Sequence, residues 1–301
     1  MESLSALLDT LAAHPPVLIG CCALLGLLVG SFLNVVIYRV PIMMDNELRA
    51  ECAALAGQEN AEPPKFNLVV PRSACPACRA PITALQNVPV ASWLALGGKC
   101  ASCKTPISAR YPAVEFTTAW LSGFIAWRFG FGWLTLAALA FTWILIALTM
   151  IDFDTQFLPD QLTFPLLWLG LLVSLAHPVW GEHAAPVTPA DSIIGAAAGY
   201  LSLWSVYWLF KFATGKEGMG YGDFKLFAAL GAWFGPWMLL PILVVASGIG
   251  AIVGIVILLR RRGGRDTQIA FGPFLTIAGW AALVAGHAVV YRYFGIFGVL
   301  T

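Results

Sequence analysis

The chain has 301 residues, of which 59% are hydrophobic and 11% are charged, and its formal net charge is +1. An ordinary soluble domain carries roughly 25% charged residues, so this composition argues against a soluble enzyme and favours a membrane protein. A charge this close to zero, with no basic stripe, gives no support for nucleic-acid binding.

Apolar segments recur along the whole chain at lengths close to the roughly 20 residues that span a bilayer. They predict an all-α polytopic membrane protein with about eight transmembrane helices: 17–38, 112–129, 132–151, 161–177, 191–213, 224–235, 237–259 and 269–291. Residues 1–16 contain no Lys or Arg, unlike the start of a secretory signal, so we expect the first segment to be retained. The sixth segment is short, and seven helices is the alternative.

Three pairs of glycines are spaced four residues apart within these segments: Gly26 and Gly30, Gly195 and Gly199, Gly250 and Gly254. Small residues at this spacing let two helix backbones approach closely. We interpret all three pairs as helix-packing positions and not as catalytic ones.

The basic residues predict the orientation of the chain in the membrane. If the N-terminus lies outside the cytoplasm, the cytosolic segments are 39–111, 152–160, 211–225 and 260–268. These segments hold 15 of the 17 Lys and Arg residues, as the positive-inside rule requires. Both termini are then expected on the outer, periplasmic side.

A polar insert of residues 41–110 separates the first two predicted transmembrane helices, and it contains four of the seven cysteines. They form two Cys-x-x-Cys pairs, Cys75 with Cys78 and Cys100 with Cys103. Two such pairs typically supply four thiolates to one tetrahedral metal ion. Disulfides are rare in the cytosol, where the orientation places this insert. The pattern predicts a structural metal site, with zinc as first choice and iron in a rubredoxin-like site as the alternative. We expect Cys21, Cys22 and Cys52 to be packing residues.

Five acidic residues lie near predicted cytosolic helix ends, where a charge close to the membrane calls for a function. They are Glu115, Asp152, Asp154, Asp160 and Asp223.

Two of these acids are expected to face each other. The third predicted helix ends at Asp152, and the sixth begins at Asp223, so both carboxylates reach the same membrane face. Two aspartates about 3 Å apart share one proton, and such a pair performs aspartic-protease chemistry. Gly220 and Gly222 can adopt positive φ and carry no Cβ, so we expect them to let the backbone turn sharply and a substrate strand approach Asp223.

The other acids have simpler interpretations. Asp is favoured as a helix N-cap. We interpret Asp160, which follows Pro159, as a cap of this kind. Asp223 has the same alternative, and both roles could belong to one side chain. The spacing alone leaves the role of Asp154 open.

Seven motifs together resemble the bacterial type IV prepilin peptidases, which are membrane aspartic proteases of the GxGD type. They are "GSFLNVVIYR" (30–39), the paired CxxC knuckles, "GGKC" (97–100), "RYPAVE" (110–115), "IDFDTQFLPD" (151–160), "GMGYGDFKL" (218–226) and "FGP" (271–273). The resemblance runs from about residue 20 to residue 290, which is nearly the whole chain.

This resemblance implies an enzyme of the bacterial inner membrane with two activities. Its active site would face the cytoplasm. It removes the basic leader of type IV prepilins and type II secretion pseudopilins after a glycine. It then N-methylates the new terminal residue, usually Phe, with S-adenosylmethionine. The catalytic positions would be Asp152 and Asp223, and the metal ligands would be the four knuckle cysteines. No motif in the sequence identifies the S-adenosylmethionine site.

The resemblance also implies a division of the chain into an N-terminal transmembrane helix (1–40), the cytosolic insert (41–110) and a helical membrane peptidase domain (111–301). Two other functions fit some of the same features. A proton-coupled transporter also has broken helices and buried acids, although no inverted repeat is evident here. A non-catalytic, zinc-stabilised scaffold for pilus assembly would need the insert but not the aspartates.

Overall fold

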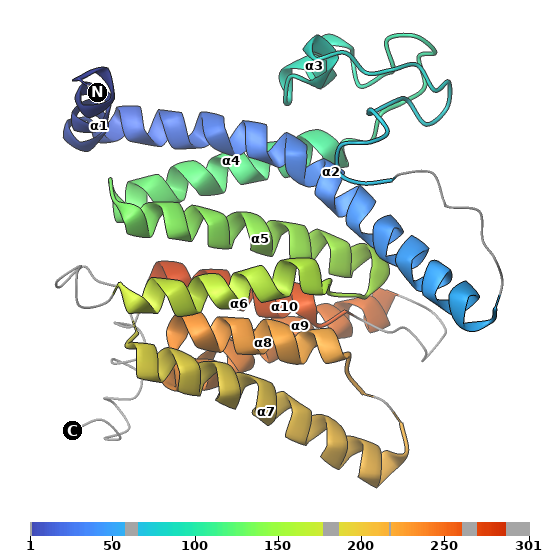
Figure 1. Cartoon of the computed structure of the whole chain (residues 1–301), viewed down its shortest axis with the longest axis vertical. Coiled ribbons are helices and arrows are strands. Elements are labelled where there is room, and N and C mark those ends of the chain that lie inside the picture. The colour runs from blue at the N-terminus through green and yellow to red at the C-terminus, as the bar shows by residue number, and fades with distance from the viewer. Residues whose placement is uncertain (1, 58–65, 177–186, 217, 261–269, 287–301) are drawn as a thin grey trace. The chain divides into compact units, whose positions relative to one another are not determined.

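The computed structural model describes residues 2–57, 66–176, 187–216, 218–260 and 270–286 (Figure 1). These residues form helices, and the only β-pairing among them consists of two isolated bridges in the insert. The predicted all-α class is therefore confirmed. The chain divides into two compact units, residues 1–135 and residues 136–301.

The first unit is built on two long helices that pack along each other, α2 (Pro15–Leu55) and α4 (Arg110–Phe129). The short helix α1 (Glu2–Ala13), which the apolar pattern did not predict, precedes α2. The insert contributes only the 3-10 turn η1 (Leu85–Asn87) and α3 (Ala91–Ala95). Gly26 and Gly30 lie at the α2–α4 contact, where an added Cβ would lie 2.5 Å from Ser122 Oγ and 2.8 Å from Glu115 Cα, respectively. The packing role of this glycine pair is confirmed.

Helix α2 continues well beyond its predicted end at residue 38. It passes through Pro41 without ending and stops at Leu55. The last part is exposed and rich in helix-forming residues, and Asp45 and Arg49 form an ion pair of 2.8 Å at helical spacing. The insert therefore begins as a polar extension of the first apolar helix, because one proline removes one backbone hydrogen bond but the following sequence still favours helix.

The described residues of the second unit form six helices. They are α5 (Trp133–Thr155, whose first three residues precede the boundary), α6 (Asp160–Leu175), α7 (Pro189–Thr214), α8 (Tyr221–Phe234), α9 (Pro236–Arg260) and α10 (Gly272–Ala285). Each agrees closely with a predicted segment. The predicted basic loop at 260–268 and the end of the segment 269–291 lie largely outside the described residues.

Helix α8 is the core of the second unit. It contacts α6, α7, α9 and α10, and Figure 1 shows it running beside α6 and α7. Its residues from Asp223 to Phe234 are buried except Lys225, which is half-buried. A helix that is apolar on all sides is expected to be surrounded by other helices. Gly195 and Gly199 of α7 lie directly against the α8 backbone, with an added Cβ at Gly199 only 2.6 Å from Phe227 O.

Four of the described helices are long and apolar enough to cross a membrane: α2, α5, α7 and α9, the last over Pro236–Ile257. Helices α6 and α10 are apolar but shorter. The count of eight transmembrane helices stays a prediction.

Candidate active site and metal centre

Asp152 lies in the last turn of α5 and is only 4% exposed. The C-terminal end of a helix disfavours a carboxylate, because the unpaired carbonyls there carry partial negative charge. The N-terminus of α10 lies against this carboxyl group, since an added Cβ at Gly272 would collide with Asp152 Oδ2. Asp152 Oδ2 is buried and has no hydrogen-bond partner among the described residues.

Asp223 lies in the first turn of α8 and is 8% exposed. The N-terminal end of a helix favours a carboxylate. Leu158 packs beside both Gly222, which precedes Asp223, and Gly272, which lies against Asp152. The structure thus brings together the two aspartates that the topology predicted to meet, and their catalytic role stays a prediction.

The alternative that Asp223 is a helix N-cap is wrong. Helix α8 begins at Tyr221, its N-cap is Gly220, and Asp223 is the third helical residue. An N-cap residue precedes the first turn and accepts hydrogen bonds from the backbone N–H groups of that turn. Asp223 itself lies within the first turn.

The expected positive φ of Gly220 and Gly222 is also wrong. Gly220 has φ of −80° and ψ of 149°, an extended conformation open to any residue, and Gly222 is part of α8. The turn requires no special backbone conformation, because an extended residue leads directly into the helix. Gly222 serves close packing instead, since an added Cβ would lie 2.8 Å from Leu158 Cβ. An added Cβ at Gly220 would lie 3.8 Å from Asp223 Oδ2, which is an ordinary contact.

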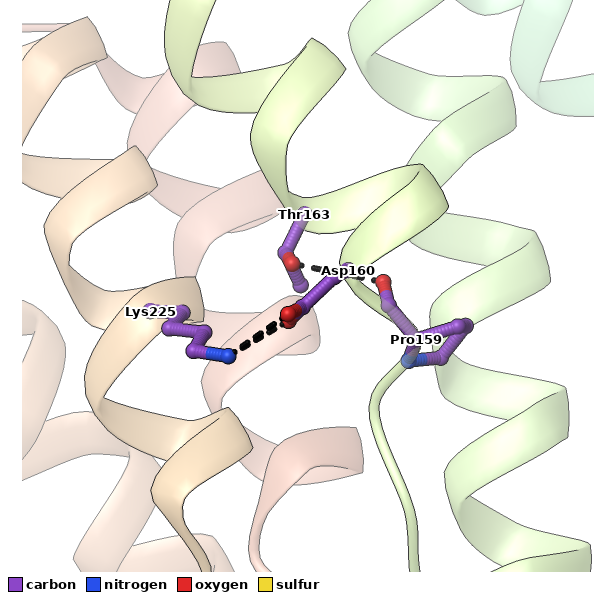
Figure 2. Close-up of polar contacts among 4 residues, drawn as sticks. All are labelled: Pro159, Asp160, Thr163 and Lys225. Carbon is purple, nitrogen blue, oxygen red and sulfur yellow. Dashed lines mark hydrogen bonds and ion pairs between the residues drawn. The ribbon is translucent and has the colours of Figure 1, made fainter. Parts of the chain in front are cut away.

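Asp160 does not cap α6 as predicted, because it is the first helical residue and Pro159 occupies the cap position. Its carboxylate binds Lys225 of α8 instead, with both oxygens 2.7 Å from Nζ (Figure 2). Lys225 also lies over the ring of Phe164, 5.4 Å from its centroid. This ion pair joins the start of α6 to α8 at Lys225, only two residues beyond Asp223.

Two polar contacts align α5 with α10 close to the aspartates. The hydroxyls of Thr149 and Thr276 are 2.7 Å apart, and Trp280 Nε1 donates to Thr142 Oγ1 at 3.2 Å. Thr149 precedes Asp152 by one turn, and Thr276 follows Gly272 by one turn. The contact between the Asp152 carboxyl group and the α10 N-terminus is therefore held by neighbouring hydrogen bonds.

The other two acids near predicted cytosolic helix ends differ from this pair. Asp154 is exposed. Glu115, in the first unit, is buried, and its Oε2 accepts a hydrogen bond of 2.7 Å from Val90 N. Val90 has φ of 58°, which is strained for a β-branched residue, and Glu115 holds it at the start of α3.

The four cysteines of the insert converge as the spacing predicted. Their Sγ atoms all lie within 4.8 Å of one another, and those of Cys75 and Cys103 are 3.7 Å apart. Tetrahedral zinc with Zn–S bonds of about 2.3 Å places its sulfurs roughly 3.8 Å apart, so the four thiols fit one ion of this kind. All seven cysteines are free thiols.

The two knuckles share one backbone design. In each, the residue after the second cysteine has positive φ, 58° for Arg79 and 60° for Lys104. The backbone N–H of the first cysteine donates to the carbonyl five residues later, at 2.9 Å for both Cys75 and Cys100. Hydrogen bonding with the side chain and backbone of Thr105 lowers the pKa of the Cys103 thiol to about 6. Thiolates are the form that binds metals.

A buried arginine of α2 holds the segment that leads into the first knuckle. Arg39 donates to Asn67 O at 2.7 Å and to Pro71 O at 2.6 Å, and it lies over the Phe66 ring. The sequence patterns gave no site role to Arg39, Gly272, Leu158 or Lys225, although all four lie in motifs that carry the family resemblance.

Two family models match the chain. One, described as Bacterial Peptidase A24 N-terminal domain, matches residues 24–129, and the other, described as Type IV leader peptidase family, matches residues 139–255. No solved structure matches the chain.

Three relatives bear the name prepilin leader peptidase/N-methyltransferase. The protein from Pseudomonas aeruginosa is 53% identical over 290 residues, which is 95% of this chain and 97% of its own length. The protein from Aeromonas hydrophila is 54% identical, with 90% of this chain and 91% of its own length covered. The protein from Stutzerimonas stutzeri is 50% identical, with 95% and 96% covered.

The matches extend over both units, and the aspartate pair lies within the span of the second family model. The relatives are about half identical to this chain over almost their full length. The similarity is therefore not confined to the apolar helices. Together with the apolar helices, these relatives indicate an integral membrane protein. The chain belongs to the type IV leader peptidase family.

Proposed function

We propose that this chain is a prepilin leader peptidase and N-methyltransferase. It cleaves the leader of type IV prepilins and type II secretion pseudopilins after a glycine, and it methylates the new N-terminal residue with S-adenosylmethionine. The main observation that supports peptidase activity is the pair of buried aspartates. Asp152 lies at the end of one helix and Asp223 at the start of another. The names of the relatives support both activities.

The chemistry requires only the two carboxyl groups and water. Two buried carboxyl groups that lie close together do not both ionise readily, so the proposed mechanism gives the pair one shared proton. The ionised carboxylate takes a proton from water as the water oxygen bonds to the carbonyl carbon, and it passes that proton to the nitrogen when the C–N bond breaks. The protonated partner donates a hydrogen bond to the carbonyl of the cleaved bond. Asp152 Oδ2, buried with no described partner, is a suitable acceptor for the water proton.

The insert is proposed to bind one structural Zn²⁺ through Cys75, Cys78, Cys100 and Cys103, with iron as the alternative. The sulfur separations and the two equivalent knuckles support a tetrathiolate site with no open position. The metal stabilises the fold of an insert that has little other regular structure. It has no part in the cleavage step.

We further propose that the protein lies in the bacterial inner membrane, with the aspartates and the insert at the cytoplasmic face and both termini in the periplasm. The positive-inside distribution of Lys and Arg supports this orientation. It places the leader-binding side where a newly made prepilin is found. We also propose that the chain has three parts: the N-terminal transmembrane helix (1–40), the cytosolic insert (41–110) and the membrane peptidase domain (111–301).

The test uses the purified chain in detergent and a purified prepilin, with mass spectrometry of the products. We expect loss of the leader after its last glycine and, with S-adenosylmethionine present, the addition of one methyl group to the new N-terminus. A transporter or a scaffold would leave the prepilin intact. Intact prepilin, together with proton-driven uptake in liposomes, would support the transporter.

A further inference from the structure

Leu158 is 3% exposed and packs against a glycine beside each aspartate. An added Cβ at Gly222, the residue before Asp223, would lie 2.8 Å from Leu158 Cβ and 3.5 Å from both Cγ and Cδ1. An added Cβ at Gly272, which touches Asp152, would lie 3.1 Å from Leu158 Cδ1. One leucine side chain therefore packs against the backbone beside each carboxyl group.

The neighbours of Leu158 hold it in place. Helix α5 ends in a tight turn at Gln156, which has φ of 54° and donates from its backbone N to Asp152 O at 2.8 Å. Pro159 and Asp160 follow Leu158 directly, and Asp160 is tied to Lys225 on α8 (Figure 2). Leu158 is thus fixed on one side by the helix that carries Asp152 and on the other by the helix that carries Asp223.

This position limits what can approach the carboxyl groups. A carbonyl oxygen polarised by an aspartate must lie within about 2.6–3.2 Å of a carboxyl oxygen. The Cα on the N-terminal side of that carbonyl is about 2.4 Å from the carbonyl oxygen, given standard bond lengths. This Cα therefore lies within about 6 Å of the carboxyl oxygen, and Leu158 packs against the chain at Gly222 and Gly272, beside the two carboxyl groups. A substrate residue with a Cβ that pointed toward Leu158 would contact the leucine side chain. The contact would be as close as that of a Cβ added at Gly222 or Gly272.

We propose that Leu158 is a specificity-determining residue that restricts the substrate residue before the cleaved bond to glycine. The inference rests on the proposed peptidase function and goes further by naming the side chain that excludes a Cβ. It distinguishes Leu158 from the aspartates, which act on any carbonyl that reaches them. A leucine that only filled the core would affect all substrates equally.

The experiment compares two prepilins that are identical except for Gly or Ala before the cleaved bond. For each, kcat/KM is measured with the purified full chain, with Leu158→Ala, and with Leu166→Ala as a matched control. Leu166 is a fully buried leucine of α6 whose carbonyl binds Trp233 Nε1, and its loss removes the same atoms from the core. Melting temperatures show whether each variant is folded.

We expect the wild type to prefer the glycine substrate, and Leu158→Ala to reduce this preference at least about tenfold by raising kcat/KM for the alanine substrate. One extra methyl group commonly changes the kcat/KM ratio of two substrates by a factor of this order. Leu158→Val, a smaller change, should shift the ratio in the same direction by less. Leu166→Ala should leave the ratio unchanged.

An unchanged ratio in folded Leu158→Ala and Leu158→Val would overturn the inference, as would an equal loss of activity on both substrates. The second result would make Leu158 a positioning residue for the aspartates. Failure of the wild type to cleave the glycine substrate would contradict the proposed function itself, and the inference with it.

Discussion

Substitution of Gly272 by alanine tests whether the α10 N-terminus positions Asp152. Gly272 is the first residue of α10, and it has no positive φ, so alanine fits the backbone and improves helix propensity by up to about 1 kcal/mol. The added Cβ collides with Asp152 Oδ2 and lies 3.1 Å from both Asp152 Cγ and Leu158 Cδ1. The hydrogen bond between Thr149 and Thr276 prevents α10 from moving away freely.

The expected effect is large on catalysis and small on stability. Restoring an ordinary contact moves the carboxyl oxygen by about 1 Å, and a displacement of this size commonly costs about 100-fold in rate, or about 2.7 kcal/mol. Overpacking costs about 1–3 kcal/mol of folding stability, partly offset by helix propensity. We therefore expect cleavage to fall about 100-fold, with a net loss of at most about 2 kcal/mol in the free energy of unfolding.

The assay is the initial rate of prepilin cleavage at saturating substrate in detergent, with thermal unfolding measured in parallel. Gly279→Ala is the matched control, because Gly279 lies on the same helix as Gly272 but away from the aspartates, and its added Cβ would lie 2.5 Å from Leu230 Cδ2 of α8. It should lower stability to a similar extent and keep most of the activity. Near wild-type cleavage by Gly272→Ala, or an equal loss in both variants, would refute the reasoning.

Three further predictions concern the ion pair, the metal and the pH dependence. Asp160→Asn and Lys225→Met should each lower stability by about 1 kcal/mol, because the ion pair is partly exposed. The double variant that combines both substitutions should lose less than the sum of the two single losses, and full additivity would show that the pair does not interact. Cys78→Ser and Cys103→Ser should abolish bound zinc in metal analysis of the purified protein, and an unchanged zinc content would contradict the tetrathiolate site. The cleavage rate should show a bell-shaped pH profile, falling in acid as the catalytic base is protonated and in alkali as the shared proton is lost, and a flat profile would count against the pair.

The sequence predicted the helices and the aspartate pair because both depend on local or topological signals. Apolar length gave the eight segments, and the ends of two of them placed Asp152 and Asp223 at one face. The metal site followed from ligand spacing alone. These features need no knowledge of how one side chain packs on another.

The features that the sequence did not predict depend on contacts between distant residues. Asp160 was interpreted as a cap because it follows Pro159, and nothing local shows that it pairs with Lys225, 65 residues later. The glycines before Asp223 suggested an unusual turn, whereas Gly222 is needed for close packing on Leu158. The continuation of α2 past Pro41 shows that a proline predicts the end of a helix only when the following residues also disfavour it.

The central claim is that Asp152 and Asp223 together cleave the prepilin, and isosteric replacement tests it most directly. Asp152→Asn and Asp223→Asn keep the size of each side chain but remove the shared proton and the base. We predict that each variant loses prepilin cleavage, keeps the melting temperature of the wild type, and still methylates a pre-cleaved prepilin with S-adenosylmethionine. Loss of both activities together would indicate one shared site, and cleavage of the prepilin by either folded variant at the wild-type rate would contradict the account.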